Sequence, residues 1–251
     1  MLPFPLMAAD LQRLDKVLSS RGYCSRGTTR ALLASGAVLV RGEIPRSPAE
    51  KVDPAAVTIE GEPLDPGTGV VILLNKPAGY TCSHRENGLL VYELMPERFQ
   101  ARNPPLSTVG RLDKETTGVL LLTDDGQLIH RLTSPRHHVP RVYEARLARP
   151  LSGSETEIFA SGTMMLEGEE KPLLPANLEV LEPQLCRVTL HEGRYHQVRR
   201  MFAAVGNHVD HLHRLRFGSI GVEGLAEGEF RFLSPAEAQS LGAPGGAVPD
   251  R

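Results

Sequence analysis

The sequence contains no tryptophan and only three cysteines among its 251 residues. Cys24, Cys82 and Cys186 lie far apart and form no Cys-x-x-Cys pair, which argues against a disulfide framework and against a thiolate metal site. No apolar run approaches the ~18–20 residues that a helix needs to cross a bilayer. The first ten residues, "MLPFPLMAAD", have no basic segment and too short an apolar stretch for a signal peptide. These absences favour a cytoplasmic protein.

Two nucleotide-binding signatures are also missing. The sequence has no GxGxxG and no GxxxxGK[ST] motif, which argues against a dinucleotide-binding sheet and against a phosphate-cradling loop. The hydrophobic content of 41% and the charged content of 23% are ordinary for a globular protein. The length allows one or two domains with a sizeable core.

The net charge of −2 conceals an uneven distribution. Residues 11–51 carry eight Arg and Lys against three Asp and Glu, a balance of +5. Residues 155–182 carry seven Glu against one Lys, a balance of −6, whereas residues 191–216 hold five Arg and five His against two acids. Charge-rich faces are usually only solvated, but two basic regions around an acidic one favour a polyanion partner.

Residues 11–64 predict a small unit of helices and strands. Apolar residues at 11, 14, 17 and 18 mark one helical face that ends before Gly22, and "SRGTTRALLASG" predicts a second helix with Ser25 as N-cap. "AVLVRGE" and "AVTIEGEPL" read as strands, the second with a tight turn at Glu60–Gly61. The turn residues of "LDPGTG" predict a flexible linker at 65–69.

A second unit is expected over residues 70–241. Strand patterns such as "VVILLNKP", "VLLLT" and "RVYEARL" alternate there with helical patterns such as "YHQVRRMFAAVG". Residues 1–10 are expected to be disordered, with Met1 or Met7 as the initiator, and residues 242–251 to form a flexible tail.

The stretch "GRLDKETTGVLLLTDDG" places Asp113 between Arg111 and Lys114, directly before an apolar strand. By spacing alone, such an Asp is most simply a turn carboxylate or a helix N-cap. A carboxylate kept ionised by neighbouring cations could instead act as a nucleophile or a base. The residues by themselves leave both interpretations open.

Longer motifs resemble two known families. "RLDKVL", "SGAVLVRG" and "DPAAVTIEG" resemble an S4-type RNA-binding domain over residues 11–64. "NKPAGY", "GRLDKETTG", "TSPRHH" and "EGRYHQVRRMFAAVGNHV" resemble the pseudouridine synthases, in the branch that acts on small-subunit rRNA. The resemblance implies an α+β fold, in which an S4-like RNA-binding domain precedes a catalytic domain with a mixed, mostly antiparallel sheet.

The resemblance also implies an activity, the conversion of a specific uridine in 16S rRNA to pseudouridine. That reaction breaks the N1–C1′ bond and joins C5 to C1′ without oxidation or an imported group, so neither a cofactor nor a metal is expected. The target nucleotide has to be flipped out of its stack. The expected partner is 16S rRNA or a small-subunit assembly intermediate, bound by a monomeric protein without membrane contact.

The resemblance assigns residues to these tasks. Asp113 matches the catalytic aspartate, Tyr143 the active-site tyrosine, and Arg199 the basic residue expected to pair with Asp113. Arg141 stands where the family often has Lys. Each assignment has a structural alternative. Asp113 could be a turn residue, Tyr143 could be a tyrosine that only packs in the core, and the basic helical hairpin of the first unit could bind a partner protein. RNA contacts are expected from Arg13, Lys16, Arg26, Arg30, Arg111, Arg136, His137, Arg194, His196, Gln197 and Arg200.

The sequence allows three other functions. One is a large-subunit rRNA target within the same family, and another is a non-catalytic RNA-binding assembly factor. The third is a metal hydrolase that uses the histidine cluster, since His211 and His213 would share one face of a strand. No spacing among these histidines forms a recognised ligand set, which argues against the third.

Overall fold

The computed structural model describes residues 11–83, 87–134 and 137–241. The segments 1–10 and 242–251, expected to lack fixed structure, and Arg136 lie outside the described residues. The chain forms two compact units: residues up to Val70 with Met95–Leu106, and Val71–Leu94 with the residues from Ser107 onward. Among the described helices, none is long and apolar enough to cross a membrane.

The first unit is built on two short helices and small sheets. Leu14, Val17 and Leu18 are buried as predicted, whereas Leu11 precedes the helix and is exposed. Ser25 is not the N-cap of the second helix; it closes the preceding turn by accepting a bond from the Thr28 amide at 3.2 Å. The elements are β1 (Gln12–Arg13), α1 (Leu14–Ser20), α2 (Thr29–Ala34), β2 (Val38–Val40), β3 (Lys51–Val52), η1 (Pro54–Ala56), β4 (Val57–Ile59), β5 (Glu62–Pro63) and η3 (Glu97–Phe99).

The segment Met95–Leu106, expected in the second domain, belongs to the first unit. Arg98 Nε donates to Asp65 Oδ2 at 2.6 Å, and Arg102 Nη2 donates to the carbonyl of Gly67 at 2.8 Å. The Asp65 amide also donates to the hydroxyl of Tyr23 at 2.9 Å. These bonds hold the stretch that was expected to be a flexible linker. Local turn composition could not reveal them, because the arginine partners follow 33 to 35 residues later.

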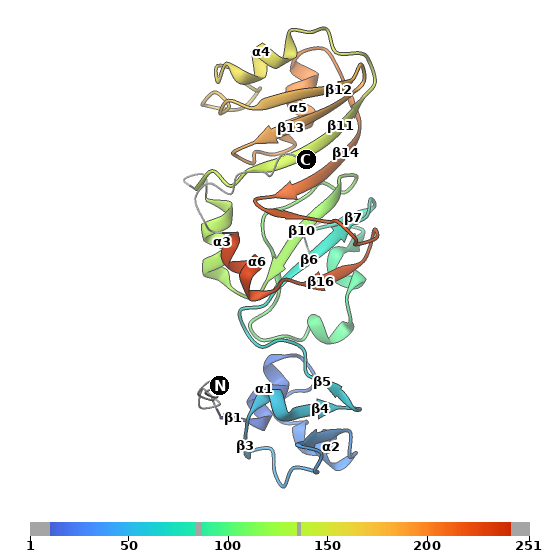
Figure 1. Ribbon diagram of the computed structural model, residues 1–251, viewed down its shortest axis with the longest axis vertical. Coiled ribbons are helices and arrows are strands. Elements are labelled where there is room, and N and C mark those ends of the chain that lie inside the picture. Colours follow the sequence, from blue (N-terminus) through green and yellow to red (C-terminus); the bar gives the residue numbers. More distant parts are fainter. Residues whose placement is uncertain (1–10, 84–86, 135–136, 242–251) are drawn as a thin grey trace, which may run out of the picture. The chain divides into compact units, whose positions relative to one another are not determined.

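The second unit contains a nine-stranded sheet with the order β12-β13-β11-β14-β10-β6-β16, with β15 on β14 and β9 on β10 (Figure 1). Only β10 and β14 are parallel among the pairs of this sheet that the structure describes, which confirms a mixed, mostly antiparallel sheet. The strands are β6 (Val71–Lys76), β7 (Tyr80–Thr81), β8 (Leu89–Leu90), β9 (Ser107–Thr108), β10 (Thr117–Thr123), β11 (Arg141–Leu147), β12 (Asn177–Glu182), β13 (Leu185–Leu190), β14 (Val209–Phe217), β15 (Ile220–Gly221) and β16 (Phe230–Phe232).

The helices of this unit cover the sheet at two places. Leu128 and Leu132 of α3 join a buried cluster with Leu73 of β6 and Leu121 of β10. The Asp125 carboxylate caps α3 by accepting from two backbone amides of its first turn. At the other end of the sheet, α4 and α5 pack through aromatic rings 5.2 Å apart (Figure 1). The described helices are η2 (Val91–Leu94), α3 (Gly126–Thr133), α4 (Glu155–Ala160), α5 (Gln197–Ala204) and α6 (Pro235–Ser240).

Gly118 allows the parallel pair to form. Its φ is +99°, and a Cβ at this position would lie 2.3 Å from the carbonyl oxygen of Arg214. A side chain cannot be placed so close to a backbone, so glycine permits β10 to run directly against β14. The start of β10 and the middle of β14 are thereby brought side by side, and residues of both line one cavity.

Candidate active site

A cavity of about 930 Å³ opens in the second unit. Its wall is formed by the turn before β10, the start of β11, the segment between β13 and α5, and β14. Residues that are remote in the sequence therefore share one space. Seven residues expected to act in catalysis or RNA binding line it: Asp113, Tyr143, Arg199, Arg111, Arg194, His196 and Gln197.

Asp113 lies on the turn before β10, and the Lys76 side chain binds backbone carbonyls of that turn. The Lys76 side chain is fully buried at the end of β6. Its Nζ donates to the carbonyls of Pro77 at 3.0 Å, Lys114 at 3.0 Å and Thr116 at 2.9 Å. Burial lowers the pKa of this ammonium group. Lys76 was not predicted to have a role, although a lysine at the end of an apolar strand indicates that its charge has a specific partner.

The carboxylate of Asp113 lies next to a histidine ring. Oδ1 of Asp113 lies 3.2 Å from Nε2 of His196, and the Asp113 side chain is 30% exposed. We expected Arg199 in this place, but its Nη1 donates to the carbonyl of Val209 at 2.7 Å. His196 precedes α5 in a left-handed conformation with φ of 48°. The helical pattern of "HQVRR" did not predict that conformation.

Tyr143 lies on β11 and is 8% exposed, with its hydroxyl 3.5 Å from Nη1 of Arg214. The Arg214 guanidinium is buried, and its Nε donates to the carbonyl of Val119 at 2.7 Å. Its Nη2 has no hydrogen-bond partner among the described residues. Arg214 was missed by sequence analysis. Arg214 shares a strand face with buried Leu212. An arginine where the alternating pattern of the strand places an apolar side chain was therefore the feature that could have identified it.

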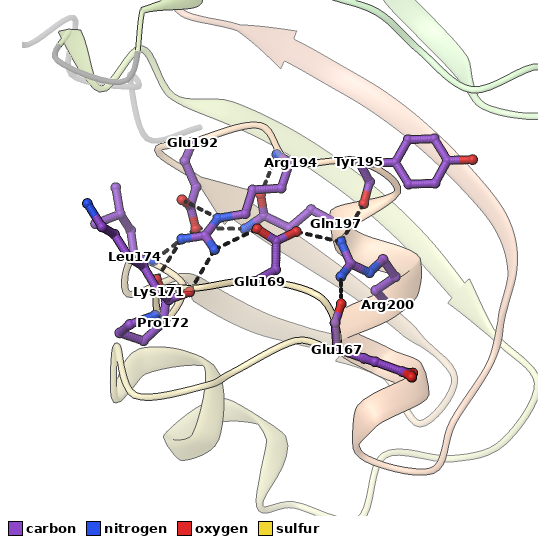
Figure 2. A network of polar contacts seen from close by, with 10 residues as sticks. All are labelled: Glu167, Glu169, Lys171, Pro172, Leu174, Glu192, Arg194, Tyr195, Gln197 and Arg200. Carbon is purple, nitrogen blue, oxygen red and sulfur yellow. Dashed lines mark hydrogen bonds and ion pairs between the residues drawn. The ribbon is translucent and has the colours of Figure 1, made fainter.

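A clamp of charged groups holds the segment between β13 and α5 (Figure 2). Arg194 donates from Nε to Glu192 at 3.0 Å, from Nη1 to Glu169 at 3.1 Å and to the Lys171 carbonyl at 2.8 Å, and from Nη2 to the Pro172 carbonyl at 2.6 Å. We use the name Glu169 clamp for this set: Glu167, Glu169, Lys171, Pro172, Glu192, Arg194, Gln197 and Arg200.

Several residues that were expected to contact RNA instead form hydrogen bonds within the Glu169 clamp. Arg200 Nη1 donates to Glu169 at 2.8 Å and to the Tyr195 carbonyl at 3.1 Å. The buried Gln197 side chain accepts from the Arg194 amide at 2.9 Å and donates to Glu192 at 3.0 Å. Hydrogen bonds from the two arginines keep the pKa of Glu169 below its ordinary value.

The other residues expected on RNA lie in several places. In the first unit, Lys16 and Arg26 line a second cavity of about 600 Å³. Arg13 is paired with Asp15 at 2.7 Å, and Arg30 is exposed on α2. In the second unit, Arg111 and His137, which were expected on RNA, are exposed.

The histidine cluster forms no recognisable metal site. Nδ1 of His213 lies 2.7 Å from Oγ1 of Thr117, and burial lowers the pKa of the His213 ring. Within residues 11–83, 87–134 and 137–241, no group of three or more His, Cys, Asp or Glu side chains is placed to hold a metal ion.

Known proteins resemble this chain over nearly its whole length. The protein named ribosomal small subunit pseudouridine synthase A of Yersinia pestis is 44% identical over 238 residues, covering 92% of this chain and 99% of that protein. The Escherichia coli (strain K12) protein of the same name is 43% identical over 235 residues, covering 91% and 99%. A crystal structure of pseudouridylate synthase matches with a TM-score of 0.65 at 38% identity, covering 91% of this chain and 99% of that chain.

Two family models match successive parts of the chain. The S4 domain family matches residues 12–58, and the family described as RNA pseudouridylate synthase matches residues 70–204. The chain therefore belongs to the RNA pseudouridylate synthase family and is an isomerase whose catalytic domain follows an S4 domain.

Proposed function

We propose that the protein converts one specific uridine of 16S rRNA to pseudouridine, acting in the cytoplasm on the rRNA or on a small-subunit assembly intermediate. The proposal is supported by 44% identity to a protein named for the small ribosomal subunit. The S4 domain supplies an RNA-binding module, whose phosphate contacts give affinity and register rather than sequence choice. Large-subunit rRNA is the competing target within the same family.

Asp113 is the reactive carboxylate in this proposal. The target nucleotide is flipped into the cavity, because a stacked nucleotide cannot present C1′ to a side chain. Asp113 then adds to C1′ or removes a proton from the sugar, and the N1–C1′ bond breaks with its electron pair going to the uracil. After the base has turned, C5 bonds to C1′; this displaces the Asp113 oxygen in the first route, and in the second route the sugar regains the proton that Asp113 removed. The C5 proton then leaves to the solvent and N1 takes one proton from it. All non-hydrogen atoms of the substrate are retained, and the hydrogen lost from C5 is the one that tritium marks.

The surrounding side chains divide the remaining tasks. His196 lies beside the Asp113 carboxylate and can orient it, and Arg199 adds a positive charge to the cavity wall. The Tyr143 ring stacks on the extruded uracil, and its hydroxyl assists removal of the C5 proton. None of these steps needs a group that the chain does not provide.

The observation that carries the proposal is the position of Asp113 in the cavity, within 3.2 Å of His196 and on a turn tied to buried Lys76. Tritium release from 5-tritiated uridine in 16S rRNA measures turnover directly. Asp113→Asn should abolish release while RNA binding stays nearly intact. Glu157→Gln, which alters an exposed carboxylate on α4, is the matched control and should release tritium at the wild-type rate. Release at that rate by the Asn variant would disprove the role of Asp113.

The target and the tyrosine need separate tests. Carbodiimide mapping of pseudouridines in cells with and without the gene should show one site lost from 16S rRNA. Loss from 23S rRNA instead would assign the large subunit, and no loss from either would favour a non-catalytic assembly factor. Full activity in Tyr143→Phe would exclude proton transfer by the hydroxyl and leave stacking as the role of this ring.

A further inference from the structure

Tyr195 is 74% exposed, more than any other large apolar or aromatic side chain among the exposed ones that the structure describes. It lies at the cavity that contains Asp113. Its ring stacks on the ring of His196, with the centroids 3.8 Å apart and the planes inclined by 16°. One ring face is therefore covered by His196. Figure 2 shows the Tyr195 ring extending away from the converging groups of the Glu169 clamp.

The backbone on both sides of Tyr195 is held firmly. Arg194 before it donates to four acceptors of the Glu169 clamp, and the Tyr195 carbonyl itself accepts from Arg200. His196 after it is tied to Asp113. Such contacts would not be expected around an exposed side chain that only lies on a mobile loop. The contacts fix the backbone that carries the Tyr195 ring, and the His196 ring lies against one of its faces, so less entropy is lost when a ligand binds.

The surroundings of the ring indicate its ligand. A protein partner that buried Tyr195 would ordinarily cover an apolar patch, but its chain neighbours Arg194 and His196 are polar, as are most residues of the nearby cavity wall. A nucleobase has a flat π face, and the phosphates beside it suit a basic rim. Aromatic side chains stack on unpaired bases in this way without reading their sequence.

We propose that Tyr195 is a stacking platform for an unpaired base that neighbours the target uridine in the RNA. The inference rests on the proposed function and extends it to a second base of the substrate. The base, Tyr195, His196 and Asp113 would then form one continuous series of contacts. Tyr195 is a binding residue in this series, so its removal should act on KM much more than on kcat.

Three substitutions separate aromaticity from bulk. Tyr195→Phe keeps the ring and should stay within about twofold of wild type. Tyr195→Leu and Tyr195→Ala should raise KM for 16S rRNA by roughly 5- to 150-fold, the range that corresponds to the loss of one base–aromatic stack. Val180→Ala removes an apolar side chain that is 53% exposed on β12, outside the residues lining the cavity, and serves as the matched control. A Leu variant with the KM of wild type would overturn the proposal.

The absence of tryptophan gives a second, direct readout. In Tyr195→Trp the introduced indole is the only one in the chain, and stacking of a base on it should quench its fluorescence when a 16S rRNA fragment binds. The same fragment should leave the fluorescence of Val180→Trp unchanged. Abasic substitution of each nucleotide beside the target should identify one whose loss removes the quenching.

The two proposals fail in different ways. Bound RNA that leaves the indole of Tyr195→Trp unquenched would refute the platform even if wild-type protein released tritium normally. Quenching that one abasic neighbour removes would support the platform even if no tritium were released. In that second case only the proposed reaction would be wrong.

Discussion

Replacing Lys76 by methionine tests whether the turn that carries Asp113 is held by a buried ammonium. Methionine nearly preserves the length and the apolar stem of lysine but removes all three donors. Lys114 O would still accept from the Gly79 amide at 2.9 Å, so the loss falls mainly on the carbonyls of Pro77 and Thr116.

The size of the effect follows from opposing contributions. Hydrogen bonds that involve a charged group contribute about 1.5–3 kcal/mol each, so two of them represent roughly 3–6 kcal/mol. Removing the charge also removes a desolvation cost, which offsets part of that loss. We expect a net decrease of about 3 kcal/mol in the free energy of unfolding of the second unit. For a domain of this size, that corresponds to a Tm lower by roughly 6–12 °C.

Activity should fall together with stability. Without Lys76 the turn can move relative to β10, and displacement of a reactive group by ~1 Å can cost about 100-fold in rate. Tritium release at a temperature well below both transitions measures kcat on folded protein, while scanning calorimetry measures Tm. Lys114→Met, at an exposed side chain on the same turn, is the stability control and should keep the wild-type Tm. Wild-type Tm and kcat in Lys76→Met would refute the reasoning.

Three further perturbations address other contacts. The Arg231 guanidinium lowers the pKa of Glu237 from 4.5 to about 2. The pair therefore adds stability above about pH 4.5, and this stability is lost as the pH falls through 2. In Glu237→Gln, calorimetry should show a smaller decrease of Tm than in wild type over that pH range. Gly118→Ala places a Cβ against the Arg214 carbonyl and should lower the free energy of unfolding by more than ~2 kcal/mol in a urea titration. Arg214→Met removes the buried cation beside Tyr143 and should lower kcat about tenfold with KM nearly unchanged, a result that an unaltered kcat would contradict.

Local patterns predicted the regular elements well. The apolar spacing placed α1 correctly apart from Leu11, and Glu60 and Gly61 form the expected tight turn with positive φ values of 52° and 87°. The helix in "YHQVRRMFAAVG" and its end before Gly206 are also present. These features depend on side-chain periodicity and on the conformational freedom of single residues, both of which are visible in a sequence.

Contacts between distant residues were not predictable in the same way. Membership of Met95–Leu106 in the first unit depends on Arg98 and Arg102 reaching the segment after Leu64. The pairing of Asp113 with His196 depends on a left-handed residue at the helix start, a conformation that is uncommon for any residue other than glycine. Motif resemblance brought Asp113 and Arg199 into one site, but it could not predict that His196, rather than Arg199, lies next to the carboxylate.

Two buried cations also hold the backbone near Asp113 and the Tyr143 hydroxyl, the two groups to which the proposed function gives chemical roles. Lys76 donates to the carbonyls of Lys114 and Thr116, close to Asp113 in the chain. Arg214 donates to the Val119 carbonyl, and its Nη1 lies near the Tyr143 hydroxyl. A buried charge without its partners is costly, so each cation strongly favours the one backbone arrangement that supplies its acceptors. Both Asp113 and Tyr143 line the same cavity, so these two supports act on different parts of one site.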